Sequence, residues 1–154
     1  MQLNELTREL GGEIFSPWVL VGQSRIDTFA DCTEDHSAVH ADTQAAAEIL
    51  GSDRTIAHGM LSLSLLSGLS TSMLERIEKR SCLNYGFDKV RFLAIVPEGR
   101  QVRGSYRLVE AVERKPGQWR IRFNARLEVE GVGQPAVKAD WLLQMEDLAA
   151  LPAV

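Results

Sequence analysis

Acidic residues and histidines gather in one short stretch of this 154-residue chain, between Asp31 and Asp42. Asp35 and His40 are five residues apart, a spacing that places two side chains on different faces of a helix, so their cooperation requires a turn. The tripeptide Asp35-His36-Ser37 predicts such a turn, because Asp and Ser side chains bond to the backbone two residues on. A carboxylate and an imidazole brought together can hold one water between them and move protons to and from a substrate.

The same residues also have a purely structural interpretation. Asp35 could only turn the chain, and His40 could be a surface side chain or a hydrogen-bonded core side chain. Paired ionisable groups are often structural, so the residue types alone favour this second interpretation and leave the catalytic one open.

A second candidate motif is Thr55-Ile56-Ala57-His58-Gly59-Met60, at the start of a predicted helix. The first turn of a helix exposes unpaired N–H groups and the positive end of the helix dipole. Glycine lets a ligand approach the backbone closely, so a carbonyl or oxyanion could accept a hydrogen bond from the Gly59 N–H. The alternative is that Gly59 only lets the helix pack tightly against a sheet.

A metal site is a further possibility that these residues raise. Asp35, His40, His58 and Asp42 could supply two histidines and a carboxylate to a metal ion. However, the two candidate histidine ligands, His40 and His58, do not have H-x-x-x-H spacing, and Asp42 also suits the N-terminus of a helix. We therefore expect no metal.

Composition narrows the class of protein. The chain is 45% hydrophobic and 25% charged, which is ordinary for a globular protein, and its length predicts a single domain over residues 1–154. Seventeen Lys and Arg against twenty-one Asp and Glu give a net charge of −4, which does not favour nucleic acid as a partner. The two cysteines make no disulfide framework, and neither a signal peptide nor a membrane-spanning stretch is visible. We therefore expect a cytoplasmic protein that binds neither nucleic acid nor membrane.

The second half of the chain predicts the scaffold for these groups. Residues 119–130 alternate without a break between apolar and polar side chains, which is typical of a half-buried antiparallel strand. Further strands are predicted at residues 18–22, 90–96, 101–108 and 137–146, with turns at 115–118 and 131–134. This half is therefore predicted to be an antiparallel meander.

Three helices are predicted in the first half. They cover residues 24–33, capped by Ser24; residues 43–50, capped by Thr43 and ended by Gly51; and residues 59–75. The third is apolar nearly all round, which is typical of a buried helix. A buried helix and a long antiparallel sheet predict an α+β fold in which the sheet curls around the helix.

Three motifs together resemble a known family. The first is Phe29-Ala30-x-x-Thr33-x-Asp35-x-x-x-Val39-His40-x-Asp42, and the second is Thr55-Ile56-Ala57-His58-Gly59-Met60-Leu61. These two resemble the MaoC-like dehydratases, the (R)-specific enoyl-CoA hydratases. The third, Asn84-Tyr85-Gly86-Phe87-Asp88-Lys89-Val90-Arg91-Phe92 followed by Val96-Pro97-x-Gly99, resembles the nodulation-protein-N-like branch of that family. The order and spacing of the motifs over about residues 17–146 make the resemblance specific.

The resemblance implies a fold and an activity. The fold is the hot-dog fold, an antiparallel sheet wrapped around one long buried helix, in a homodimer with active sites near the interface. The activity is addition of water to a trans-2-enoyl thioester to give an (R)-3-hydroxyacyl-CoA, or the reverse, with no cofactor beyond the coenzyme A of the acyl-CoA substrate.

The resemblance also assigns roles to residues. Asp35 and His40 match the catalytic pair of the family, Gly59 matches the glycine that binds the thioester carbonyl, and Ser64 matches a serine near the pair. Ser37 and His58 are expected to support the pair.

Departures from the family pattern leave alternatives open. Glu34 stands where the family has Gly, so a positive φ is harder to adopt there. Ser37 replaces a longer Asn or Gln, and Ala38 replaces Pro or Trp. One alternative is a hot-dog acyl-CoA thioesterase, in which water attacks the carbonyl carbon. The other is a non-catalytic domain that binds acyl thioesters.

Overall fold

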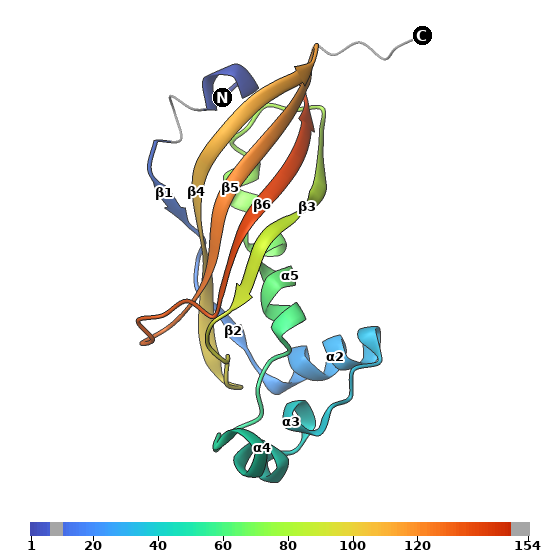
Figure 1. Ribbon diagram of the computed structural model, residues 1–154, viewed down its shortest axis with the longest axis vertical. Coiled ribbons are helices and arrows are strands. Elements are labelled where there is room, and N and C mark those ends of the chain that lie inside the picture. Colours follow the sequence, from blue (N-terminus) through green and yellow to red (C-terminus); the bar gives the residue numbers. More distant parts are fainter. Residues whose placement is uncertain (7–10, 149–154) are drawn as a thin grey trace.

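The computed structural model describes residues 1–6 and 11–148, and its main feature is an antiparallel sheet packed over one helix, α5 (Gly59–Leu69) (Figure 1). The strands are β1 (Glu13–Phe15), β2 (Val19–Val21), β3 (Ser81–Phe92), β4 (Arg100–Lys115), β5 (Gln118–Val129) and β6 (Val137–Glu146). Their order is β1-β4-β5-β6-β3, and β2 also pairs with β4. The predicted domain of residues 1–154 includes residues 7–10 and 149–154, which lie outside the described part.

The centre of the sheet confirms the alternation seen in the sequence. β5 pairs with β4 from Val102↔Val129 to Lys115↔Gln118, and with β6 from Gln118↔Glu146 to Leu127↔Val137. Every second side chain of β5, from Ile121 to Val129, is buried against the helix side of the sheet. A shift of the register by one residue would turn all of these apolar side chains to the other face of the sheet, so the alternation opposes such a shift.

The core joins the sheet to α5 through a buried tyrosine. The Tyr106 hydroxyl donates a hydrogen bond of 2.6 Å to the Leu66 carbonyl, and burial raises the pKa of Tyr106. A Cβ at position 104 would lie 2.2 Å from that hydroxyl oxygen, so the Tyr106 ring can lie over its own strand because residue 104 is Gly. This contact fixes how α5 lies on the sheet.

The predicted strand at residues 90–96 is wrong in its bounds, since β3 covers Ser81–Phe92. β3 lies at the edge of the sheet, and its register with β6 shifts twice, between Asn84 and Gly86 and between Asp88 and Arg91. Each shift moves the following side chains to the other face, so the strand shows no continuous alternation in the sequence.

The third sequence motif therefore has a structural explanation in β3. Asn84 accepts a hydrogen bond of 3.0 Å from Trp141 Nε1, and the Phe87 ring stacks on Trp141 with centroids 5.9 Å apart. At the end of the strand, Phe92 packs against Gly59 at the start of α5. The motif attaches the edge strand to the core.

The long helix predicted over residues 59–75 is interrupted. α5 ends at Leu69, and a separate short helix, α6 (Thr71–Leu74), follows Ser70. The hydroxyls of Ser70 and Thr71 donate to the carbonyls of Ser67 and Gly68 and so compete with helical bonding. The prediction that this helix is buried on all sides is also wrong, because Met60, Ser64, Ser67 and Gly68 of α5 are exposed.

Three further helices, α2 (Gln23–Thr33), α3 (Ala38–Ala41) and α4 (Thr43–Leu50), gather at the N-terminal end of α5 (Figure 1). The 3-10 helix η1 (Leu3–Glu5) lies at the opposite end of the sheet. The predicted caps are displaced by one or two residues. α2 follows Gly22, and α4 is capped by Asp42, whose Oδ1 accepts from the N–H groups of Gln44 and Ala45.

The end of α4 agrees with the sequence, since Gly51 adopts the left-handed conformation (φ 66°). Within the described part of the chain, no helix is both long enough and apolar enough to cross a membrane.

Candidate active site

Three side chains from separate segments meet at the N-terminal end of α5. The carboxylate of Asp35 and one ring nitrogen each from His40 and His58 all lie within 4.8 Å of one another. Asp35 lies in the loop between α2 and α3, His40 lies in α3, and His58 directly precedes α5. The structure thus brings together the two residues of the predicted pair and His58, which the sequence analysis expects to support them.

Asp35 is held by the turn that the sequence predicts. Its Oδ1 accepts hydrogen bonds from the Ser37 hydroxyl, at 2.6 Å, and from the Ser37 N–H, at 3.3 Å. These bonds hold the pKa of Asp35 below its usual value. Asp35 is exposed and therefore presents an ionised carboxylate at neutral pH.

The backbone before Asp35 shows the consequence of Glu34. This residue ends α2 in the left-handed conformation, with φ 60° and ψ 16°. Glycine adopts that conformation without a penalty, whereas a side chain makes it unfavourable. The loop keeps the backbone shape that the family's glycine favours, although the residue is different.

His40 has one ring nitrogen bonded and one available. Its Nδ1 lies 2.8 Å from the Ile56 carbonyl oxygen, and a carbonyl can only accept, so Nδ1 carries the proton. Nε2 of the neutral ring is then an unprotonated base. The Ile56 N–H donates to the Val39 carbonyl at 3.1 Å, which holds the two segments together.

Gln23 holds the backbone of His40 in place, and sequence reasoning missed it. Its Nε2 donates to the His40 carbonyl at 2.8 Å and to Asp27 Oδ1 at 2.7 Å. Its Oε1 accepts a hydrogen bond of 2.5 Å from the Thr55 hydroxyl. His40 and Thr55 lie 17 and 32 residues away in sequence, so no local pattern could indicate these bonds.

His58 is buried, with 2% of its surface exposed, and contacts both members of the pair. Its Nε2 lies 2.9 Å from the Asp35 backbone carbonyl, and its ring stacks on His40 with centroids 3.7 Å apart. The Phe29 ring lies against it, at 5.0 Å between centroids. No atom in the described residues makes a hydrogen bond with its buried Nδ1.

Gly59 supports both interpretations that the sequence allows. As the first residue of α5, it has an N–H that helical geometry leaves without an intrahelical acceptor. A Cβ there would also lie 3.2 Å from Cδ1 and Cε1 of Phe92, which is a close packing contact. Ser64 is exposed five residues further along α5, and within the described part it makes no hydrogen bond with Asp35 or His40.

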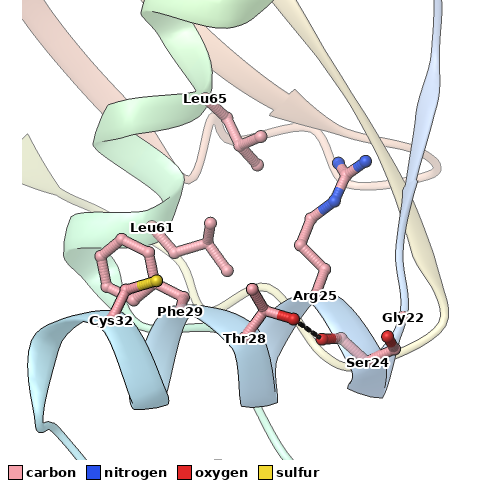
Figure 2. A pocket seen from close by; sticks show the side chains of 8 residues that line it. All are labelled: Gly22, Ser24, Arg25, Thr28, Phe29, Cys32, Leu61 and Leu65. Atoms are coloured by element: carbon pink, nitrogen blue, oxygen red, sulfur yellow. Dashed lines mark hydrogen bonds between the residues drawn. The ribbon is translucent and has the colours of Figure 1, made fainter.

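An apolar cavity of about 620 Å³, wide open to the surface, lies between α2 and α5 (Figure 2). Its lining is formed by Gly22, Ser24, Arg25, Thr28, Phe29, Cys32, Leu61 and Leu65. The Thr28 hydroxyl donates to the Ser24 carbonyl at 2.8 Å and so has a partner within α2. Phe29 connects the cavity to the catalytic pair, because the same ring packs against His58.

The two histidines are poorly arranged for a shared metal ion. Their rings lie face to face at an interplanar angle of 27°, so the lone pairs in the ring planes run side by side. A metal requires donor lone pairs that converge on one point. The expectation that the site holds no metal stays a prediction.

The comparisons with known proteins agree with this arrangement. The sequence profile described as "MaoC like domain" matches residues 8–129. Nodulation protein N of Rhizobium leguminosarum bv. viciae is 37% identical over 144 residues, which are 92% of this chain and 89% of that protein. The 3-hydroxyacyl-thioester dehydratase Z of Mycobacterium tuberculosis (strain CDC 1551 / Oshkosh) is 38% identical over 130 residues, covering 84% of this chain and 85% of that protein.

A solved structure extends the likeness to three dimensions. The (R)-hydratase from A. caviae, involved in PHA biosynthesis, superposes with a TM-score of 0.72 at 27% identity, over 88% of this chain and 95% of that one. The antiparallel sheet over α5 is the hot-dog fold of these proteins, as predicted. The chain therefore belongs to the MaoC-like dehydratase family, a family of acyl-thioester hydratases and dehydratases.

Proposed function

We propose that this protein is an (R)-specific enoyl-CoA hydratase, which adds water to a trans-2-enoyl-CoA or removes it in reverse. The observation that carries the proposal is the pairing of the Asp35 carboxylate with the imidazole of His40. A carboxylate oxygen of Asp35 and one ring nitrogen of His40 lie within 4.8 Å of each other, beside an apolar cavity of about 620 Å³. Membership of a hydratase and dehydratase family supports the same chemistry.

The proposed reaction uses these groups as an acid and base pair. A water held between Asp35 and His40 Nε2 loses a proton to one of them, and its oxygen forms a bond to C3 of the substrate. Electrons of the C2=C3 bond move toward the thioester carbonyl, whose oxygen gains negative charge and accepts from the Gly59 N–H. A proton then returns to C2, so the elements of one water are added in total.

The cavity between α2 and α5 is the proposed site of the acyl chain. Its lining is mostly carbon, and Phe29 places it next to His58 and therefore next to the pair. Leu61 and Leu65 of α5 form one wall (Figure 2). An apolar chain that moves from water into this cavity is stabilised in proportion to the apolar area it buries.

The proposal also covers the surroundings of the site. Ser37, Ser64 and His58 support the pair, and the coenzyme A of the substrate is the only cofactor. The enzyme works as a homodimer in the cytoplasm. Large apolar side chains support the dimer, since Met60, Phe92, Leu93 and Ile95 are all exposed in the single chain.

The test is hydration of crotonyl-CoA, followed by loss of the enoyl-thioester absorbance. Wild-type protein is expected to form (R)-3-hydroxybutyryl-CoA, and Asp35→Asn is expected to form almost none. Release of free thiol from a saturated acyl-CoA would instead indicate a thioesterase. Binding of acyl-CoA without turnover, by a folded protein, would indicate a binding domain and contradict the proposal.

A further inference from the structure

We propose that His58 is a positioning residue, a single buried side chain that holds Asp35 and His40 in register with each other. This role rests on the proposed function, because it concerns the same pair. Among the contacts of the site, those of His58 reach the backbone of one catalytic residue and the ring of the other.

The first contact anchors an exposed loop. All residues from Asp31 to Ala38 are exposed, so little packing holds Asp35 in place. His58 is buried, and its Nε2–H donates to the Asp35 carbonyl at 2.9 Å. The bond fixes the main chain of Asp35, and the two bonds from Ser37 then orient the carboxylate.

The second contact restricts the ring of His40. The two imidazoles stack at 3.7 Å between centroids, while His40 Nδ1 is bonded to the Ile56 carbonyl. The stacking limits tilting of the ring, and the hydrogen bond limits its rotation. The His40 ring is thereby held beside Asp35, with one of its ring nitrogens within 4.8 Å of the carboxylate.

Helix capping does not explain a histidine at this position. His58 is the N-cap residue of α5, where Ser, Thr, Asp or Asn would bond the first turn, yet its side chain makes no capping bond. Its buried Nδ1 also has no hydrogen-bond partner within the described residues, and an unpaired buried acceptor lowers stability. The two contacts with the catalytic pair therefore explain why a histidine occupies this position despite the loss of stability.

Three substitutions separate the two contacts. His58→Gln can keep the donor to the Asp35 carbonyl and lacks the stacked ring, whereas His58→Phe keeps a ring and lacks the donor. His58→Ala lacks both. With crotonyl-CoA we expect His58→Gln and His58→Phe each to lower kcat by about tenfold, and His58→Ala to lower it by about 100-fold. KM should stay within about twofold of the wild-type value, because misplacement of reacting groups slows the chemical step.

His36→Gln provides a matched control. His36 is exposed next to Asp35, and the same His-to-Gln change there should leave kcat within about twofold of wild type. Thermal melts show whether each variant is folded. Wild-type kcat in His58→Ala would overturn the proposal. The proposal would also be overturned if a smaller folded fraction fully explained the loss of kcat in the three His58 variants.

A second readout does not depend on turnover. The chain has three histidines, so their ring proton resonances can be assigned from single substitutions. We expect the His40 resonances to shift in His58→Gln and His58→Ala, because the stacked ring is lost, while the His36 resonances stay in place. Unchanged His40 resonances would overturn the positioning role. Absence of hydration by wild-type protein together with these shifts would reject the proposed function and keep the positioning role.

Discussion

Strands β4 to β6 and the segment from α2 to His58 are held in place by different interactions. The strands are joined by continuous backbone pairing, and every second side chain of β5 from Ile121 to Val129 is buried. The segment is held by side chains that bond distant backbone atoms, such as Gln23 to the His40 carbonyl and His58 to the Asp35 carbonyl.

This difference separates stability from chemistry within one fold. In the strands, a substitution removes packing that the whole molecule shares, so the free energy of unfolding should fall. In the segment, many residues are exposed, so a substitution should mainly change where Asp35 and His40 lie and lower the rate. Substitutions in the strands therefore test the effect on stability, and substitutions in the segment test the effect on the rate.

The largest effect on activity is expected from the catalytic pair. Asp35→Asn and His40→Ala should each lower kcat for crotonyl-CoA by about 10²–10⁴-fold, because each removes general acid–base catalysis. Their melting temperatures should stay near that of wild type, since Asp35 is exposed and His40 only partly buried. Unfolding of both variants would contradict the separation of stability from chemistry. Full activity would show that Asp35 and His40 are not the catalytic pair.

The largest effect on stability is expected in the sheet. Phe123 is fully buried in β5 and packs near Trp141, with ring centroids 6.4 Å apart. Phe123→Ala should lower the free energy of unfolding by about 3–5 kcal/mol, measured by urea denaturation. Its kcat per folded molecule, measured at low temperature, should remain close to wild type. A folded variant with a large loss of kcat would show that the two regions are not separable.

An intermediate effect is expected at Gln23. Gln23→Leu removes the bonds to the His40 carbonyl, to Asp27 and to Thr55, and should lower kcat by about tenfold. Gln44→Leu is the matched control, because among the described residues the Gln44 side-chain amide bonds only the exposed Glu48 on α4. Equal rates for the two variants would mean that Gln23 does not position His40.

A shift in pH dependence is expected at Ser37. Its hydroxyl holds the pKa of Asp35 below the usual value, so an ionised Asp35 persists as the pH falls. In Ser37→Ala the pKa should rise, so the side-chain carboxyl carbon resonance of Asp35 should titrate at higher pH than in wild type, while the rate near neutral pH changes little. A titration of Asp35 that stays in place, or moves to lower pH, would show that the Ser37 hydroxyl does not stabilise the carboxylate.

A change in chain-length preference, with little effect on the catalytic pair, is expected from the cavity. Leu65→Trp fills space between α2 and α5 without touching the pair. It should lower kcat/KM for octenoyl-CoA relative to crotonyl-CoA by about tenfold, since steric exclusion of a few methylenes has about this effect. Equal loss for both substrates would place the acyl chain elsewhere.

The sequence predicts the strands best where one face is buried without interruption. Buried side chains alternate with less buried ones along β6, and along β5 from Ile121 onward. The matching two-residue period in the sequence is therefore enough to predict both strands and the face that each one buries. β3 contains two register shifts, and the alternation that marks a strand is lost. The end of α5 was misplaced for a related reason, because the hydroxyls of Ser70 and Thr71 interrupt a stretch with apolar composition.

The sequence predicts the site only as far as local chemistry reaches. The turn at Asp35 and Ser37 spans two residues, and the density of acids and histidines indicates Asp35 and His40. Gln23 and Thr55 bond across 32 residues, and nothing near either of them in sequence signals the partner. Ser64 was placed near the pair by resemblance, and the structure leaves its side chain exposed on α5.

The most direct test of the central claim follows the fate of the substrate in D₂O. Wild-type protein and Asp35→Asn are incubated with crotonyl-CoA, and the product is analysed by mass spectrometry and chiral chromatography. The account predicts that wild type forms (R)-3-hydroxybutyryl-CoA with one deuterium at C2, and that Asp35→Asn leaves crotonyl-CoA nearly unchanged. Free coenzyme A, or no product from folded wild-type protein with this substrate and with octenoyl-CoA, would contradict it.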